Sequence, residues 1–230
     1  MKRKIVIAIL CAAVSMGTVG CGNSTASAKK TQTQTDKKED SKSENSEKSS
    51  EEKQSRDIFA MDTYMTVTAY GEHASEAVDK AETEIKRLDE MLSTGNENSE
   101  VYKLNQNGEA VVSDDTAYLY ERSEKIYKQT KGVFDISIYP VMDAWGFTTQ
   151  NYRVPSADEL QQLLTRVNYK QVRQNGSDVS IPADVQVDLG GIAKGYTSSR
   201  IMEIYKSLGI TSGLVNLGGN VQALGSKPDG

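Results

Sequence analysis

The 230-residue chain contains one histidine and two cysteines, so several kinds of catalytic site are excluded at once. His73 stands where a helix is expected to begin and is read as a surface residue. Cys11 lies inside an apolar stretch near the start, and Cys21 follows it. If the apolar stretch is removed, one cysteine remains, which excludes an intrachain disulfide and a cysteine-based zinc site. Ser–His and Cys–His nucleophile pairs are excluded for the same reason.

The first residues are typical of a sorting signal rather than of a folded element. Residues 2–4 are basic, residues 5–16 form an apolar run too short to span a bilayer, and small residues precede Cys21. This order resembles a bacterial lipobox, with residues 1–20 removed and Cys21 as the lipidated first residue. An ordinary secretory signal or an uncleaved anchor is the alternative. The lipoprotein interpretation places the protein at the outer face of the cytoplasmic membrane.

Residues 22–56 have almost no apolar side chains, and their eight basic and seven acidic residues nearly cancel. A segment of this composition cannot bury enough surface to offset its ordering entropy. Residues 21–56 are therefore predicted to be a lipidated cysteine followed by a disordered tether. The folded domain is predicted over 57–230, where 16 basic and 25 acidic residues give a net charge of −9. That charge speaks against a nucleic-acid partner.

The folded part shows both strand-like alternation and helical periodicity, without a regular strand–helix–strand rhythm. We therefore predict an α+β fold with mixed sheets and packed helices. The expected strands are 61–70, 110–112, a short one near Gln171, 179–182, 185–188, 213–217 and 221–225. The expected helices are 73–92, 99–105, 113–129, 156–166, with a capping box at its start, and 192–208.

The stretch from Val185 to Tyr196 carries the clearest chemical signal. An apolar strand is expected to end at Asp188, to pass through two glycines and to enter a helix near Ile192. Such a junction presents unpaired backbone N–H groups where the helix dipole is positive, and therefore suits a phosphate. Lys194 adds a charge at the same point. Neither the P-loop nor the dinucleotide fingerprint is present, and paired glycines after a strand are often plain turns.

A second segment, residues 132–147, holds the only tryptophan and two of the three phenylalanines. It is interpreted as core, as a wall for a flat ring system, or as both. Asp135 is a polar group within this apolar setting.

Several short motifs stand together in one order and spacing. They are Met61-Asp-Thr63, Leu92-Ser-Thr94 before Leu104-Asn105, Gly132-Val-Phe-Asp135 with Trp145-Gly-Phe147, Asp188-Leu-Gly-Gly-Ile-Ala-Lys-Gly195, and Gly213-Leu-Val-Asn-Leu-Gly-Gly-Asn220 with Lys227-Pro-Asp-Gly230. Over residues 59–230 they resemble the ApbE family, the FAD:protein FMN transferases. The resemblance implies an ApbE-like fold and binding of FAD. It also implies Mg²⁺-dependent transfer of FMN to a Thr or Ser hydroxyl of an acceptor flavoprotein, with release of AMP.

The resemblance also implies site residues in the first half of the domain. Met61 matches the family's FAD-contacting methionine, within Met-Asp-Thr where Met-Gly-Thr is commoner. Val133, Phe134 and Asp135 match the segment that lines the flavin site.

In the second half, Asp188 and Lys194 match ligand-contacting positions. Gly191 falls where a backbone carbonyl reaches the metal. The family often has an aromatic residue after Leu-Ser-Thr, where this chain has Gly95. Tyr102 is a candidate for supplying that ring.

Three questions stay open at the level of sequence. No general base or acceptor protein is identified, and the family's acidic and hydroxyl metal ligands lie beyond Gly230. The expected final strand is followed by turn residues, and the chain is read as a fragment of a longer protein. The rival functions are an FAD pyrophosphatase giving FMN and AMP, and a non-catalytic lipid-anchored flavin-binding module.

Overall fold

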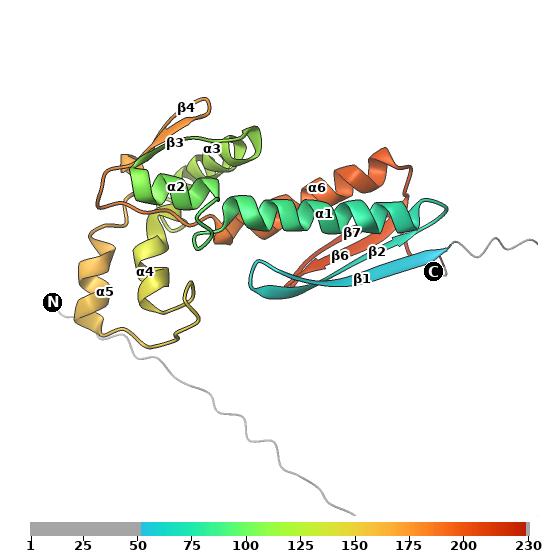
Figure 1. The fold of residues 1–230 in the computed structure, drawn as a ribbon, viewed down its shortest axis with the longest axis horizontal. Coiled ribbons are helices and arrows are strands. Elements are labelled where there is room, and N and C mark those ends of the chain that lie inside the picture. Colours follow the sequence, from blue (N-terminus) through green and yellow to red (C-terminus); the bar gives the residue numbers. More distant parts are fainter. Residues whose placement is uncertain (1–51, 229–230) are drawn as a thin grey trace, which may run out of the picture. The chain divides into compact units, whose positions relative to one another are not determined.

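A computed structural model describes residues 52–228, which belong to one compact unit (Figure 1). The predicted signal, Cys21 and nearly all of the predicted tether lie outside the described residues. No helix within residues 52–228 has both the length and the apolar character needed to cross a bilayer. The fold is α+β, as predicted, with two antiparallel sheets and packed helices.

The larger sheet has four strands in the order β1-β2-β6-β7, all antiparallel to their neighbours. Its strands are β1 (Lys53–Ala60), β2 (Thr63–Tyr70), β6 (Ser212–Leu217) and β7 (Asn220–Leu224). Two long helices, α1 (Ala74–Leu92) and α6 (Gly190–Ser207), lie side by side against one face of this sheet (Figure 1). Alternating apolar residues of the strands and one stripe of each helix form the first hydrophobic core.

The predicted tether boundary was wrong by four residues, because β1 begins at Lys53 rather than after Arg56. Arg56 is on the inner row of β1 and extends its guanidinium to α1, 2.7 Å from Asp79 and 2.5 Å from Glu82. In the sequence, the polar residues of an edge strand resemble those of a linker, because the strand and side chains that they bind belong to other elements.

Strand β2 begins at Thr63, two residues later than the predicted strand 61–70, because Met61 and Asp62 form the turn between β1 and β2. Both residues have positive φ, 48° and 55°. This is the backbone that a two-residue hairpin turn requires and that glycine adopts most easily. The turn therefore gives a physical reason to expect glycine at position 62, where this chain has Asp62.

The second sheet is small and has the order β3-β5-β4. Its strands are β3 (Glu109–Val111), β4 (Arg173–Asn175) and β5 (Asp178–Ser180), next to α2 (Glu100–Asn107) and α3 (Asp114–Gln129). These elements and the ends of α1 and α6 form a second hydrophobic core. Between α3 and β4 the chain forms a 3₁₀ helix (Ile136–Ile138), α4 (Tyr139–Ala144), α5 (Ala157–Leu164) and a second 3₁₀ helix (Tyr169–Gln171).

Two predicted helix starts are confirmed by their caps. The Ser113 hydroxyl accepts from the backbone N–H of Thr116, and the Ser156 hydroxyl accepts from that of Glu159. The helix that Ser156 caps, α5, has its leucines at three-to-four spacing, yet no residue of α5 is buried and Leu164 is 51% exposed. Three-to-four spacing marks an amphipathic helix but does not say how deeply its apolar face is covered.

The predicted strand before α6 is also wrong. Residues 185–189 bury alternate side chains, as a strand would, but they pair with neither sheet. Instead, the Asn105 side chain binds Val187 on both sides: its amide donates to the Val187 carbonyl and its oxygen accepts from the Val187 N–H, both at 2.8 Å. The next N–H, of Asp188, donates to the carbonyl of Ile136 at 2.8 Å. Helix α6 then begins at Gly190, two residues earlier than predicted.

Candidate functional site

A pocket of about 520 Å³ lies where α1 and α6 pass from the first core to the second. Met61 packs against both cores at this point. Four parts of the chain line the pocket: the β1–β2 turn, the end of α1 with the loop after it, the segment after α4, and the start of α6. The lining residues are Met61, Asp62, Leu88, Asp89, Leu92, Ser93, Thr94, Gly95, Met142, Phe147, Thr148, Tyr152, Asp188, Gly190, Ala193 and Lys194.

Met61, Asp188 and Lys194, predicted from distant parts of the sequence, are therefore brought into one pocket. The first N–H groups of a helix have no partner within the helix and carry the positive end of its dipole. In α6, the Asp188 carboxylate accepts a hydrogen bond from the first of these groups, the Gly190 N–H, at 2.6 Å. The N–H groups of Ile192 and Ala193 donate to the Leu189 carbonyl at 3.0 and 2.9 Å, so within the first turn the Gly191 N–H is the one left for an anion.

The pocket holds two carboxylates whose ionisation is disfavoured. Burial raises the pKa of Asp188, against the opposing effects of the Gly190 N–H and the Lys194 ammonium. Burial also raises the pKa of Asp89, against a hydrogen bond from the Met61 N–H. A partly buried carboxylate with a raised pKa next to an ammonium group is a common arrangement at binding and catalytic sites.

Gly191 lies directly beside an aromatic ring. A Cβ at this position would be 3.1 Å from Cε2 of Phe134, so the glycine permits the ring to approach the start of α6. Phe134 thus contacts the helix that lines the pocket, although it does not line the pocket itself. The predicted roles of Phe134 and of the Gly191 carbonyl stay predictions.

Val133 and Asp135 also lie outside the pocket lining. Val133 is 89% exposed. Asp135 caps the first 3₁₀ helix by accepting from the N–H and the hydroxyl of Ser137, at 2.9 and 2.6 Å. Its other oxygen accepts from the N–H of Tyr169 at 3.0 Å, which ties together two segments of the second core. These contacts give Asp135 a structural role, and its predicted flavin contact stays a prediction.

Several pocket residues were not assigned a role from the sequence: Asp62, Asp89, Met142, Thr148 and Tyr152. Asp89 lies on α1 one turn before the Leu92-Ser-Thr94 motif, and this closeness to a quoted motif could have marked it as a candidate site residue. Tyr152 stands in a polar loop with no periodicity, so no sequence pattern marks it. Asn105 belongs to the Leu104-Asn105 motif, and its two hydrogen bonds to the backbone of Val187 fix the segment that carries Asp188.

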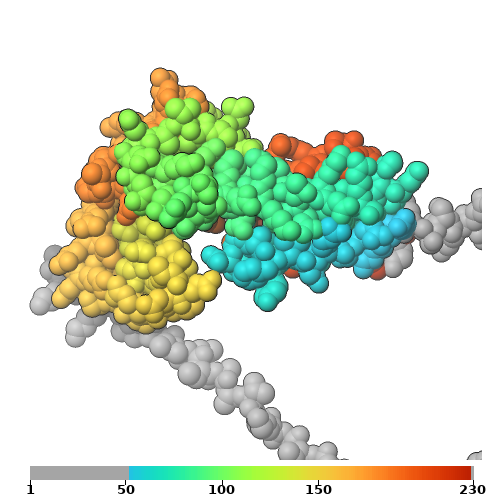
Figure 2. Space-filling view, viewed as in Figure 1, coloured from blue at the N-terminus to red at the C-terminus, as the bar shows by residue number. Residues whose placement is uncertain are grey.

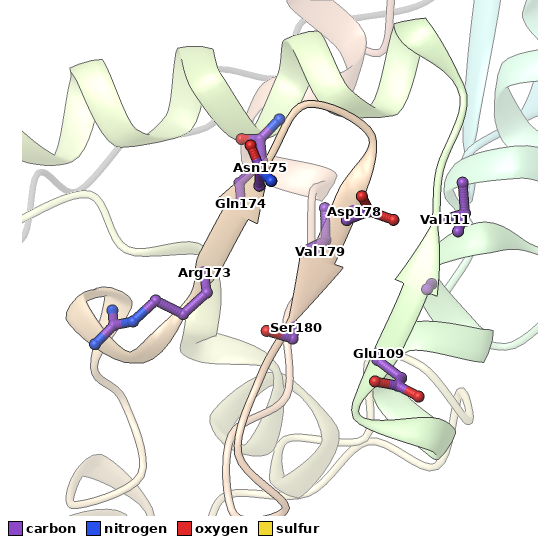
Figure 3. Close-up of a pocket in the computed structure, with 9 residues that line it drawn as sticks. Glu109, Val111, Arg173, Gln174, Asn175, Asp178, Val179 and Ser180 are labelled. Carbon is purple, nitrogen blue, oxygen red and sulfur yellow. The ribbon is translucent and has the colours of Figure 1, made fainter.

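A larger hollow of about 820 Å³ lies over the small sheet and contains none of the predicted site residues (Figure 3). Its lining comes from short strands, and the close-up shows Glu109, Arg173 and Asp178 apart from one another, each on a different strand. Ligand sites are recognised by convergent polar groups within an enclosed surface rather than by volume alone. We therefore place the functional site at the smaller pocket.

Within residues 52–228, no three His, Cys, Asp or Glu side chains are grouped so as to hold a metal ion. The predicted metal contact, Gly191, would supply only a backbone carbonyl. The described residues therefore do not by themselves form a magnesium site of the usual oxygen-rich kind.

Comparison with known proteins agrees with this fold. A family model described as "ApbE family" matches residues 61–230. A FAD:protein FMN transferase of Treponema pallidum is 33% identical over 162 residues, which are 66% of this chain and 45% of that protein. A FAD:protein FMN transferase of Vibrio cholerae is 28% identical over 160 residues, 65% of this chain and 48% of that protein.

Solved structures show the same fold. The ApbE protein of Thermotoga maritima has a TM-score of 0.71 and 29% identity, covering 76% of this chain and 60% of that chain. The apo form of the Pseudomonas stutzeri flavinyl transferase ApbE has a TM-score of 0.70 and 26% identity, covering 78% and 60%. The chain spans about half the length of the curated relatives it matches. From its sequence match and its fold, the chain belongs to the ApbE family.

Proposed function

We propose that this chain provides the FAD-binding part of an FAD:protein FMN transferase, which moves FMN from FAD to a Thr or Ser hydroxyl of an acceptor flavoprotein. The observation that carries the proposal is the pocket in which Met61, Asp188, Lys194 and the start of α6 meet. The names of the relatives support the same reaction.

The reaction is a substitution at phosphorus. The acceptor hydroxyl oxygen forms a bond to the FMN phosphorus, the bridging P–O bond of the pyrophosphate breaks, AMP leaves and the hydroxyl proton is released. Negative charge gathers on the phosphate oxygens during this step, so fixed positive groups accelerate it. In this chain those groups are the Gly191 N–H, at the positive end of the α6 dipole, and the Lys194 ammonium.

Asp188 acts in this proposal by holding the backbone in place. Its carboxylate fixes the Gly190 N–H at 2.6 Å, and Asn105 fixes the preceding residue, so the start of α6 is organised before a ligand arrives. Preorganised dipoles need no rearrangement during the reaction, which is why they are effective.

The proposal includes Mg²⁺ on the strength of the family resemblance, with the Gly191 carbonyl as one ligand. Because the described residues contain no grouped metal ligands, we assign no step of the reaction to a metal held by them.

We further propose that the protein is a lipoprotein, anchored through Cys21 at the outer face of the cytoplasmic membrane. The support is the sequence order of basic residues, apolar run and small residues before Cys21. Metabolic labelling with a fatty-acid analogue would be expected to label the wild-type chain and not Cys21→Ser. Equal labelling of both forms would contradict the anchor.

The transferase proposal is tested by incubating the full-length protein with FAD, Mg²⁺ and an acceptor domain that carries a Thr or Ser flavinylation site. Mass spectrometry of the acceptor is expected to show covalent addition of FMN, together with free AMP. Free FMN without acceptor modification would instead indicate an FAD pyrophosphatase. Intact FAD after long incubation would indicate a flavin-binding module. Asp188→Ala is expected to lower the rate, and Asp178→Ala, on the small sheet, serves as a matched control.

A further inference from the structure

Two exposed aromatic rings line the pocket from the segment between α4 and α5. Phe147 is 46% exposed and Tyr152 is 68% exposed, and both belong to the pocket lining. In Figure 2 this segment, coloured yellow, faces the tip of the β1–β2 hairpin, coloured cyan. A single exposed aromatic residue is ordinary, but two that converge on one pocket leave a large apolar surface for a ligand.

The rings are held in a defined arrangement. Their centroids are 6.0 Å apart with an interplanar angle of 67°, and Trp145 stacks behind Phe147 at 6.4 Å and 20°. Edge-to-face and offset-stacked pairs at these distances are the favoured geometries of aromatic side chains. Phe147 therefore cannot turn freely, and one face of the pair is left without an aromatic neighbour.

The backbone builds this arrangement through Gly146. This residue has φ +79°, and a Cβ there would be 2.0 Å from the carbonyl oxygen of Asn151. The chain folds back closely at this point, and the Arg153 N–H closes the loop on the Trp145 carbonyl at 3.1 Å. The Thr148 hydroxyl adds a bond to Asp143 at 2.8 Å.

The same pocket is open at Gly95. A Cβ there would meet only Ser93 Oγ, at 3.9 Å, so no neighbouring side chain fills the space. Tyr102, the ring suggested from the sequence, does not line the pocket. The aromatic surface of the pocket thus comes from the segment after α4 and not from the loop after α1.

We propose that Phe147 and Tyr152 stack against a flat ring of FAD and so position the dinucleotide, with its phosphates at the start of α6. This inference rests on the proposed function; it gives Phe147 of the Trp145-Gly-Phe147 motif a stacking role and adds Tyr152, which stands in none of the motifs. The shared chemistry is a planar aromatic ring, which both the flavin and the adenine of FAD provide.

The test compares FAD binding by the full chain with that of Phe147→Leu and Tyr152→Leu, which keep apolar bulk but remove the ring. Stacking of a base on an aromatic side chain contributes enough that each variant is expected to raise the Kd for FAD about tenfold. Tyr152→Phe is expected to restore binding. Tyr118→Leu removes an exposed tyrosine away from this pocket and is expected to leave the Kd unchanged.

Separate titrations with FMN and ADP identify the stacked ring, because the two variants are expected to weaken only the ligand that carries it. If the wild type quenches flavin fluorescence and the two leucine variants do not, the ring of FAD that stacks on Phe147 and Tyr152 is the flavin rather than the adenine. If wild-type chain binds FAD and both leucine variants bind equally well, the inference is overturned and the proposed function stands. If wild-type chain does not bind FAD, both are overturned.

Discussion

Replacement of Gly146 by alanine tests how the loop that carries Phe147 and Tyr152 is built. Two penalties act at this position. The left-handed backbone costs an L-residue about 1 kcal/mol, and a Cβ at 2.0 Å from the Asn151 carbonyl forces a backbone shift of the kind that costs about 1–3 kcal/mol. The expected loss in the free energy of unfolding is therefore roughly 2–4 kcal/mol.

Gly176→Ala is the matched control for this variant. Gly176 has φ +61°, but a Cβ there would meet nothing within 4 Å, so only the backbone penalty of about 1 kcal/mol applies. At about 2–4 °C per kcal/mol for a domain of this size, Gly176→Ala is expected to lower the Tm by about 2–4 °C.

Thermal unfolding followed by circular dichroism measures both variants. Gly146→Ala is expected to lower the Tm by roughly 4–16 °C, more than its control, and to weaken FAD binding because the aromatic loop is displaced. If the two variants melt at the same temperature, the close contact with Asn151 does not constrain the loop and the reasoning is refuted.

Three further predictions concern the turn at Asp62 and the segment that carries Asp188. Asp62 has φ 55°, a backbone conformation that glycine adopts without strain. Asp62→Gly is therefore expected to be at least as stable as wild type, and Asp62→Ala less stable by about 1 kcal/mol. The reverse order of melting temperatures would contradict the proposed backbone strain at this residue. Asn105→Ala leaves the buried N–H and carbonyl of Val187 without their partner, so urea unfolding should show a loss of about 2–4 kcal/mol, and an unchanged midpoint would count against this bond pair. Burial raises the pKa of Asp188, which means that ionisation at neutral pH destabilises the fold. Asp188→Asn is therefore expected to raise the Tm at pH 7, with a gain that fades as the pH falls through the folded pKa towards the unfolded value; a gain that grows on acidification would contradict the burial effect.

The sequence predicted the parts of the fold that local patterns determine. Helix α1, the Ser113 and Ser156 caps and the break of β6 at two glycines all follow from residues close together in the chain. The exceptions depend on contacts between distant residues. Lys53–Arg56 form a strand because they pair with residues 67–70 of β2, and Arg56 also contacts α1. Residues 185–189 stay out of both sheets because Asn105 takes the hydrogen bonds of Val187.

The candidate site divides in the same way. Met61, Asp188 and Lys194 meet in one pocket, as their motifs suggested. Tyr152 was not found because its place depends on the fold-back at Gly146, which a loop sequence does not reveal. The contacts of Asp135 could not be predicted either, since Tyr169 lies 34 residues away.

The central claim is that the start of α6 and Lys194 bind the phosphates of FAD. Isothermal titration of FAD and of riboflavin, which lacks phosphates, into wild-type chain and Lys194→Ala tests it most directly. A hydrogen bond to a charged group contributes about 1.5–3 kcal/mol, so the variant is expected to raise the Kd for FAD by about 10- to 100-fold and to leave the Kd for riboflavin unchanged. An equal affinity of wild type and Lys194→Ala for FAD would contradict the account.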